Sequence, residues 1–406
     1  MSETAGLYVT AKQAAAELGV SLPTIYAYVS RGMVRSTPSD QGRDHRYFVE
    51  DVRALVKRRS ELGKAQRPGA DSGAAGLPVV DTELGLITGE KLYYRGTDVM
   101  KLAGSASLEQ AASLLWGCAD LSAFEDAAPP KSPLLTRLRA EKSLGPIPRC
   151  LAALPIAADA DAAARTATDA GRWQTGARIL RLMLEMMSAR ASTSAPIHKQ
   201  LADAWTPSSK AAADILRQCL VLLAEHELNA SSFTVRCAVS TGASLYHGVT
   251  AGLAALTGPR HGGATFASTK MLQDFAASGK PAEVVAAYVD AGLPFVGFGH
   301  FLYPNGDPRA RLLLRTIREA FPKNAMVGLA LDGAARVDKA VGRKPNIDYA
   351  LALAEAVLEL PKGAAMCLFA LGRTAGWIGH AIEQYKTGVL IRPRARYIGP
   401  PPKEKL

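Results

Sequence analysis

Two histidines and one aspartate lie in Gly- and Pro-rich stretches, where a side chain seldom packs into a core. His261 stands in Gly-Pro-Arg-His-Gly-Gly, His300 ends Gly-Phe-Gly-His, and Asp348 ends Pro-Asn-Ile-Asp. Flanking glycines let the polar atoms of a ligand approach the backbone and leave an imidazole accessible. These residue types suit a reaction that removes a proton from carbon, because a base must take the proton while neutral donors hold the enolate oxygen.

Basic side chains that could bind an anion flank these stretches. They are His226 in His-Glu-Leu-Asn, Arg309 in Asp-Pro-Arg, Arg373 in Gly-Arg-Thr-Ala-Gly-Trp, and Arg392 in Ile-Arg-Pro-Arg. The planar guanidinium of arginine binds a carboxylate through paired hydrogen bonds. Several Arg and His side chains that converge on one cavity would therefore suit a dicarboxylate.

Each of these residues also has a structural interpretation. His226 follows an apolar helical stretch and could cap the C-terminal end of that helix. Asp348 stands where a helix starts and could be an N-cap, while Arg309 could be a surface residue of a capped turn. Arg373 lies in an apolar helix and needs a partner, since a buried unpaired charge is costly, and that partner could be a structural ion pair. Taken singly, the residues leave both interpretations open.

Taken together and in this order, the stretches resemble the citrate synthase family. The resemblance implies that Asp348 removes a methyl proton from acetyl-CoA and that His261 holds the thioester carbonyl and the enolate formed from it. It implies that His300 polarises the ketone of oxaloacetate and protonates the developing alkoxide. The expected reaction joins acetyl-CoA, oxaloacetate and water to give citrate and CoA, without a metal or bound cofactor. Propionyl-CoA, which would give 2-methylcitrate, stays open as the acyl donor.

The same resemblance assigns the residues that bind substrate. Oxaloacetate is expected to be held by His226, Arg309, Arg373 and, supplied by the partner subunit of a homodimer, Arg392. The resemblance covers residues 79–400. It departs from the family at Thr265, where Asn is common, and at Phe301, where Arg is common. Both positions lie on the expected acyl-CoA side, so they leave the acyl preference open.

Length and composition limit the class of protein. The chain has 406 residues, a formal charge of +11 and 48% hydrophobic residues, which is ample for a large core. Its apolar stretches are too short to span a bilayer, and we see no export signal. The five cysteines lack metal-type spacing and are expected to be buried in a reducing compartment. We therefore expect a cytoplasmic protein whose positive charge serves nucleic acid, anionic small molecules, or both.

The N-terminal residues carry the pattern of a DNA-binding module. Thr10-Ala-Lys-Gln13 has the spacing of a capping box and opens a short helix, and Ser21 precedes a second helix that stops at Gly32. Short strands at residues 33–35 and 46–48 and a third helix from about Glu50 to Arg59 are expected to follow. Residues 8–60 thus resemble the winged helix-turn-helix modules of the MerR and excisionase type.

In this interpretation the second helix enters the DNA major groove. The candidate DNA contacts are Thr24, Tyr26, Tyr28 and Arg31 on that helix and Arg43 and Arg46 on the wing. A degenerate module or a protein-docking module is the alternative. Because a single module has little affinity, DNA binding would need a dimer.

The remaining pattern is overwhelmingly helical. Apolar residues recur at helical spacing at 107–116, 172–191, 208–225, 241–256, 266–278, 282–291, 308–321, 348–359 and 362–383. A small sheet is expected before residue 95, and residues 120–170, which match the family poorly, are expected to form surface loops and short helices.

The fold class expected is mainly α. We predict a small winged helix-turn-helix domain over 1–64, a flexible linker over 65–77 and a citrate synthase-like helical body over 78–406. That body is expected to have two domains, with a small domain at about 263–370 inserted in the large one.

Two functions from different classes fit the whole chain. One is a condensing enzyme, and the other is a transcription regulator that uses a citrate synthase-like body as a metabolite sensor. An intact base and both electrophilic histidines favour the enzyme, because sensing needs binding but does not need Asp348. A bifunctional enzyme and regulator would account for every feature.

Overall fold

A computed structural model gives the arrangement of most of the chain. It describes residues 8–18, 20, 22–30, 34–38, 45–49, 51–53, 80–125, 127–209, 211–393 and 397–400. The chain divides into two compact units, Met1–Val79 and Val80–Leu406. The linker predicted at 65–77 lies outside the described residues.

The N-terminal unit combines two helices with a small antiparallel sheet. The helices are α1 (Ala11–Leu18) and α2 (Leu22–Ser30), and the strands β1 (Tyr8–Thr10), β2 (Ser36–Pro38) and β3 (His45–Phe48) pair in the order β1-β3-β2. The predicted capping box is present at Thr10, whose backbone N–H donates to Gln13 Oε1 at 2.9 Å. Ile25 and Val52, both fully buried, belong to the apolar core of this unit.

The second strand of this sheet begins later in the chain than predicted. The sequence indicated a strand over residues 33–35, whereas β2 starts at Ser36. Arg35 instead donates three hydrogen bonds to the Asp51 carboxylate, from its backbone N–H at 2.8 Å and from its Nε and Nη2 groups at 2.9 Å. Asp51, Val52 and Arg53 are helical, and the rest of the predicted third helix lies outside the described residues.

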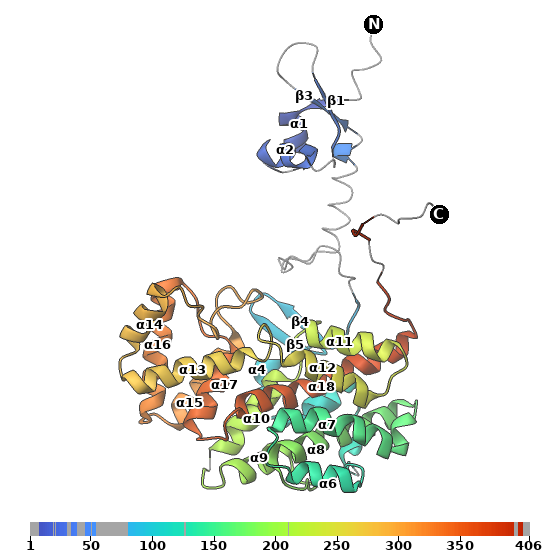
Figure 1. The fold of residues 1–406 in the computed structure, drawn as a ribbon, viewed down its shortest axis with the longest axis vertical. Helices are drawn as coiled ribbons and strands as arrows, with labels where there is room; N and C mark the ends of the chain where they lie inside the picture. The colour runs from blue at the N-terminus through green and yellow to red at the C-terminus, as the bar shows by residue number, and fades with distance from the viewer. Residues whose placement is uncertain are drawn as a thin grey trace. The chain divides into compact units, whose positions relative to one another are not determined.

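The second unit is built almost entirely of helices, so the prediction of a mainly α fold is confirmed (Figure 1). It opens with the predicted small sheet, an antiparallel arrangement in the order β4-β5-β6. Its strands are β4 (Gly85–Thr88), β5 (Lys91–Tyr94) and β6 (Thr97–Asp98). The helices are α4 (Val99–Ser105), α5 (Leu108–Trp116), α6 (Pro133–Ala140), α7 (Pro146–Ala160), α8 (Asp169–Ser188), α9 (Ile197–Trp205), α10 (Ala212–Leu223), α11 (Ala230–Ser240), α12 (Leu245–Leu256), α13 (Ala264–Ser278), α14 (Pro281–Asp290), α15 (Pro308–Ala320), α16 (Ala325–Val341), α17 (Ile347–Val357) and α18 (Ala364–Thr387).

Helix α18 is the central element of this unit. It contacts α5, α8, α10, α11 and α12, and every residue from Ala364 to Ile382 is buried. A helix that is apolar on all sides is stable only where other elements cover it completely. The charged Arg373 and His380 in its interior are therefore in an environment that demands partners.

The stretch at 120–170 is more regular than predicted. It holds two 3₁₀ turns and the short helix α6, as expected, but also the 15-residue helix α7. Cys150 and Leu154 of α7 are fully buried, and the helix packs on α8 and α12. The interpretation as surface loops and short helices is therefore wrong for this part.

Helices α13 to α17 pack largely on one another and gather at one side of the unit (Figure 1). Their contact depends on close approach between α13 and α16. Gly333 of α16 lies so near the fully buried Phe275 of α13 that an added Cβ would be 2.3 Å from the ring.

No described helix is long and apolar enough to cross a membrane. All five cysteines are free thiols, and four of them are buried.

We expect Gly333→Ala to destabilise the protein by about 1–3 kcal/mol, because the added methyl group overpacks the contact between α13 and α16. Gly328→Ala is the matched control on the same helix, since no atom lies within 4 Å of its Cβ position, and it should stabilise by about 0.5–1 kcal/mol. Urea unfolding of both variants measures the difference. Equal effects of the two changes would contradict the described packing of α16.

Candidate active site

His226 lies in the loop between α10 and α11. Asn229 fixes the end of this loop as the N-cap of α11, its Oδ1 accepting the backbone N–H of Ser232 at 3.1 Å. The His226 side chain is buried, and its Nε2 lies 3.0 Å from the hydroxyl of Tyr303. Because the ring pairs with Tyr303 and lies beyond the end of α10 at Leu223, the structure does not support a helix-capping role for His226.

His261 lies in the tight turn between α12 and α13, where the backbone needs glycine. A Cβ at Gly263 would lie 2.7 Å from the carbonyl oxygen of Thr257. The Nε2 atom of His261 is 2.8 Å from Ser231 Oγ. That hydroxyl also accepts the indole N–H of Trp377 at 3.1 Å, so Ser231 links the imidazole to the central helix.

The environment of His300 fixes where its proton lies. Its Nδ1 accepts the backbone N–H of Leu302 at 3.2 Å, so the neutral ring carries its proton on Nε2. The ring stacks on Phe301 with 5.2 Å between centroids and an interplanar angle of 14°. It also meets His226 edge-on at 5.1 Å, so the two imidazoles lie side by side.

Arg309 is buried and paired, which excludes the interpretation as a surface arginine. Its Nε and Nη2 groups donate to the Asp307 carboxylate at 3.0 and 2.8 Å. Asp307 is the N-cap of α15, and its Oδ2 also accepts the backbone N–H of Ile347 at 3.0 Å. Asp307 therefore ties the start of α15 to the start of α17, and Nη1 of Arg309 forms no hydrogen bond with the described residues.

Asp348 is in the first turn of α17 but is not its N-cap. Asn346 is the N-cap, since its Oδ1 accepts the backbone N–H of Asp348 at 3.0 Å. The Oδ1 atom of Asp348 is buried and has no hydrogen-bond partner among the described residues. Burial raises the pKa of Asp348 to about 7, with Arg309 opposing this rise and Asp307 adding to it. A carboxylate of this kind is basic near neutral pH.

Arg373 is 1% exposed and projects from α18. Its Nε donates to the carbonyl oxygen of Leu223 at 2.8 Å, and its guanidinium lies over the ring of Phe369. It forms no ion pair with any residue that the structure describes, so the structural ion pair considered from the sequence is not formed. Burial lowers the pKa of Arg373 to about 10, with the Glu225 carboxylate opposing this fall.

The imidazoles are neutral at physiological pH. Burial lowers the pKa of His261 and of His300 to about 4, with Arg373 and Arg309 respectively adding to the effect. Burial followed by Arg309 also holds the pKa of His226 well below its ordinary value. Neutral rings of this kind can donate a hydrogen bond to a carbonyl or enolate oxygen without carrying charge into the site.

The remaining predicted positions are Arg392, Thr265 and Phe301. Arg392 follows α18, is exposed and forms no hydrogen bond or ion pair within the described part of the chain. Thr265 is buried and donates to the carbonyl oxygen of Gly262 at 2.9 Å, which braces the turn of His261. Phe301 is 66% exposed.

Sequence reasoning missed several supporting residues. Tyr303 and Ser231 contact the ring nitrogens of His226 and His261. Asp307 was noted only as part of Asp-Pro-Arg. Asp followed by Pro is typical of a helix start and could have marked Asp307 as a cap, whereas no local signal indicates Tyr303 or Ser231.

The candidate DNA contacts belong to the N-terminal unit. On α2, Tyr26 is 55% exposed, and Thr24 and Tyr28 are partly buried. Arg46 is exposed on β3. Arg31 and Arg43 lie outside the described residues.

The fold and site together define a helical protein with a buried, arginine-rich acid–base site. Residues 73–394 match the family described as citrate synthase, C-terminal domain. The citrate synthase of Haloferax volcanii is 31% identical over 361 residues, which are 80% of this chain and 95% of that protein. The chain therefore belongs to the citrate synthase family.

Two further similarities accompany this match. The putative citrate synthase 2 of Mycobacterium tuberculosis is 36% identical over 190 residues, which cover 45% of this chain and about half (50%) of the length of that relative. The fold is similar to that of citrate synthase from the thermophilic archaeon Thermoplasma acidophilum, solved with carboxymethyl coenzyme A and oxaloacetate. The TM-score is 0.69 at 24% identity, covering 81% of this chain and 96% of that one.

The raised pKa of Asp348 predicts a pH-dependent loss of stability. Between 3.8 and about 7 the folded state keeps a proton that the unfolded state releases, so stability falls as pH rises through this window and levels off above it. Asp348→Asn cannot ionise, so its stability relative to the wild type should increase from about pH 4 to about pH 8. Urea unfolding of both proteins across this range measures it. A difference that does not change with pH would contradict the pKa assigned to Asp348.

Proposed function

We propose that the protein is a condensing enzyme of the citrate synthase type, which joins acetyl-CoA, oxaloacetate and water to give citrate and CoA. The observation that carries this proposal is the buried Oδ1 of Asp348, which has no hydrogen-bond partner among the described residues and belongs to a carboxyl with a pKa near neutrality. The family relationship supports it, as does the complex of the Thermoplasma acidophilum enzyme with oxaloacetate and a CoA derivative.

Oxaloacetate binding uses the groups that the protein leaves without partners. Nη1 of Arg309 and the Nη groups of Arg373 form no hydrogen bonds with the described residues, and both side chains are buried. They bind the substrate carboxylates, together with His226 and with Arg392 of the partner subunit in a homodimer. The Nε2–H of His300 donates to the ketone oxygen.

Asp348 then removes a proton from the methyl group of acetyl-CoA. The electrons of the broken C–H bond form the enolate, whose oxygen accepts a hydrogen bond from Nδ1–H of His261. That tautomer requires Nε2 of His261, 2.8 Å from the Ser231 hydroxyl, to accept the hydroxyl proton, which the same hydroxyl otherwise donates to Asn229 Oδ1 at 2.8 Å. Asp348 and His261 act as one unit, since proton removal and enolate support occur together.

The enolate carbon attacks the ketone carbon of oxaloacetate. The ketone oxygen becomes an alkoxide and takes the proton from Nε2 of His300, whose neutral tautomer is set by the Leu302 N–H. The ring regains a proton from the water that enters for hydrolysis, and Asp348 releases its proton to solvent. Water then hydrolyses the thioester of the citryl-CoA intermediate, breaking the C–S bond and releasing CoA. Closure of the helices that carry Asp348 excludes water until the new carbon–carbon bond has formed.

Release of free CoA tests this proposal directly. With oxaloacetate present, the wild type should release CoA from acetyl- or propionyl-CoA, and the faster thioester identifies the acyl donor. Asp348→Asn should lower kcat by about 10²–10⁴-fold, because it lacks the base. Asp332→Asn, which removes a carboxylate from an exposed ion pair on α16, is the control and should keep full activity. No turnover with either thioester, in a folded protein that binds oxaloacetate, would overturn the enzyme in favour of a metabolite sensor.

The N-terminal unit favours a second activity, which is DNA binding. We propose that this unit is a winged helix-turn-helix module that binds DNA through α2. Its paired helices pack on an antiparallel sheet that contains the hairpin of β2 and β3, and Tyr26 on α2 and Arg46 on β3 are exposed. An aromatic side chain and a guanidinium are suited to contacts with DNA bases and phosphates. With an active body, the protein would be both enzyme and regulator.

Gel-shift titration of the full chain tests DNA binding. Arg46→Ala should weaken binding and lower the salt slope by about 1, as expected for loss of one phosphate contact. Lys12→Ala removes an exposed positive charge from α1 and should have a smaller effect. Absence of any retained DNA at low salt would overturn the DNA-binding proposal without affecting the enzyme.

A further inference from the structure

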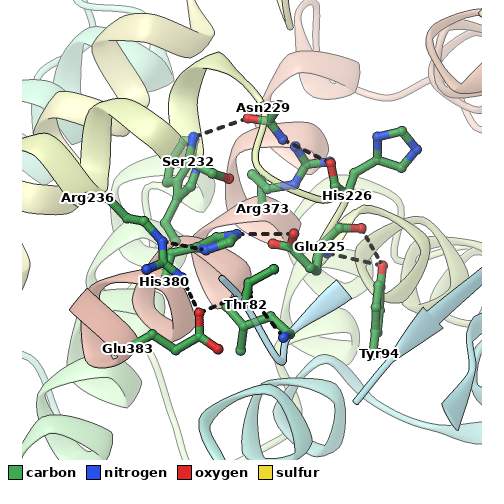
Figure 2. Close-up of polar contacts among 12 residues, drawn as sticks. Thr82, Tyr94, Glu225, His226, Asn229, Ser232, Arg236, Arg373, His380 and Glu383 are labelled. Carbon is green, nitrogen blue, oxygen red and sulfur yellow. Dashed lines mark hydrogen bonds and ion pairs between the residues drawn. The ribbon is translucent and has the colours of Figure 1, made fainter. Parts of the chain in front are cut away.

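A chain of buried side chains leads from α11 and α18 to the residue before His226 (Figure 2). Arg236, His380 and Glu225 are each 0% exposed. Nε–H of Arg236 donates to Nδ1 of His380 at 3.1 Å. Because Nδ1 is the acceptor, the neutral imidazole carries its proton on Nε2, which lies 3.2 Å from Oε1 of Glu225 and donates to it.

Arg236, at the other end of this row of side chains, is also fixed by hydrogen bonds. Arg236 forms an ion pair with Glu383 and donates from Nη1 to Gln384 Oε1 at 3.3 Å. Glu383 in turn accepts the hydroxyl of Thr82 and the backbone N–H of Glu83, both at 2.8 Å. The orientation of His380, and with it the proton aimed at Glu225, is therefore fixed from both sides.

Glu225 is fixed at its backbone as well as at its carboxylate. Its N–H donates to the hydroxyl oxygen of Tyr94 at 3.1 Å, and the Tyr94 hydroxyl lies 3.0 Å from the Glu225 carbonyl oxygen. The second carboxylate oxygen, Oε2, is buried without a hydrogen-bond partner among the described residues. It packs against α18, since a Cβ at Gly376 would lie 2.4 Å from it.

This position places a negative charge beside Arg373. Gly376 and Arg373 are one turn apart on α18, and Glu225 is the strongest of the groups that favour the charged guanidinium. The other ionisable groups that interact with Arg373 are Arg309, Tyr94, Asp348, Tyr303, His226 and His261. A buried guanidinium without an ion pair is costly, so the fixed carboxylate of Glu225 stabilises it at a distance while leaving its Nη groups free for a ligand.

We infer that Glu225, oriented by His380 and Arg236, is a positioning residue that keeps Arg373 charged and aligned for a substrate carboxylate. The inference rests on the proposed function for the identity of that substrate. Direct pairing of Glu225 with Arg373 would occupy the groups that bind the dicarboxylate. Because His380 accounts for the hydrogen bond of the Glu225 carboxylate, that carboxylate supplies negative charge without occupying the Nη groups of Arg373.

Glu225→Gln tests this inference by removing the charge while keeping an oxygen that can accept the Nε2–H of His380. Titration calorimetry with oxaloacetate, without acyl-CoA, should show at least a 10-fold loss of affinity at neutral pH. Binding needs a charged Arg373, and the variant lacks the Glu225 carboxylate that opposes the fall in the pKa of that residue. Affinity should therefore also fall at a lower pH than in the wild type. Affinity and pH dependence equal to those of the wild type would overturn the inference.

Two further variants separate positioning from general stability. Glu355→Gln removes a buried carboxylate that accepts the backbone N–H groups of Ala365 and Gly363, so it should lower stability without changing oxaloacetate affinity. His380→Gln leaves Glu225 charged but removes the imidazole that holds its carboxylate in place. It should weaken oxaloacetate binding by several fold without changing the pH above which affinity falls. Unchanged affinity in His380→Gln would contradict the positioning role. Since these readouts need no turnover, a wild type that binds oxaloacetate without releasing CoA would refute the proposed enzyme alone.

Discussion

The arrangement of the site depends on the side chain of Asp307. Its two oxygens hold Arg309 through three hydrogen bonds, one from the backbone and two from the guanidinium, and they accept the backbone N–H of Ile347. The first contacts keep a buried arginine neutralised, and the last brings the start of α17 against the loop that carries His300. Asp348 is the next residue after Ile347, so the position of the proposed base follows from a neighbouring carboxylate that has a structural role.

Burial explains the other properties of the site. The same loss of water that lowers the pKa of the three histidines raises that of Asp348. The site thus combines neutral hydrogen-bond donors with a carboxylate that is basic near pH 7. The positive charge remains with Arg309, whose partner is Asp307, and with Arg373, which Glu225 stabilises. This distribution suits a dianionic substrate that meets a neutral thioester.

The sequence predicted candidates for the reacting groups but not the residues that position them. His261, His300 and Asp348 stand in Gly- and Pro-rich stretches, whose residue types indicate loops with accessible side chains. The structure places these three residues on loops or at a helix start. Ser231 and Tyr303 act through contacts between segments far apart in the chain, which no local pattern encodes.

Helices α7, α11 and α16 were not predicted from the sequence because they, too, depend on contacts between distant segments. Helix α11 is rich in Ser, Thr and Val, which disfavour helices in isolation, and it forms because α12 and α18 cover it. Helix α16 contains two glycines, and the close approach of Gly333 to Phe275 explains one of them. Helix α7 includes Pro155. A proline disfavours a helix interior, so the sequence alone does not indicate this helix, which packs on α8.

In the proposed reaction, Asp348 removes a proton from the methyl group of acetyl-CoA. The most direct measurement follows the entry of deuterium into that methyl group in D₂O by mass spectrometry, with malate bound in place of oxaloacetate. Malate carries a hydroxyl where oxaloacetate has its ketone, so proton removal can occur while condensation cannot. Deuterium should enter the methyl group with the wild type and not with Asp348→Asn. Undiminished exchange in that variant would contradict this role of Asp348.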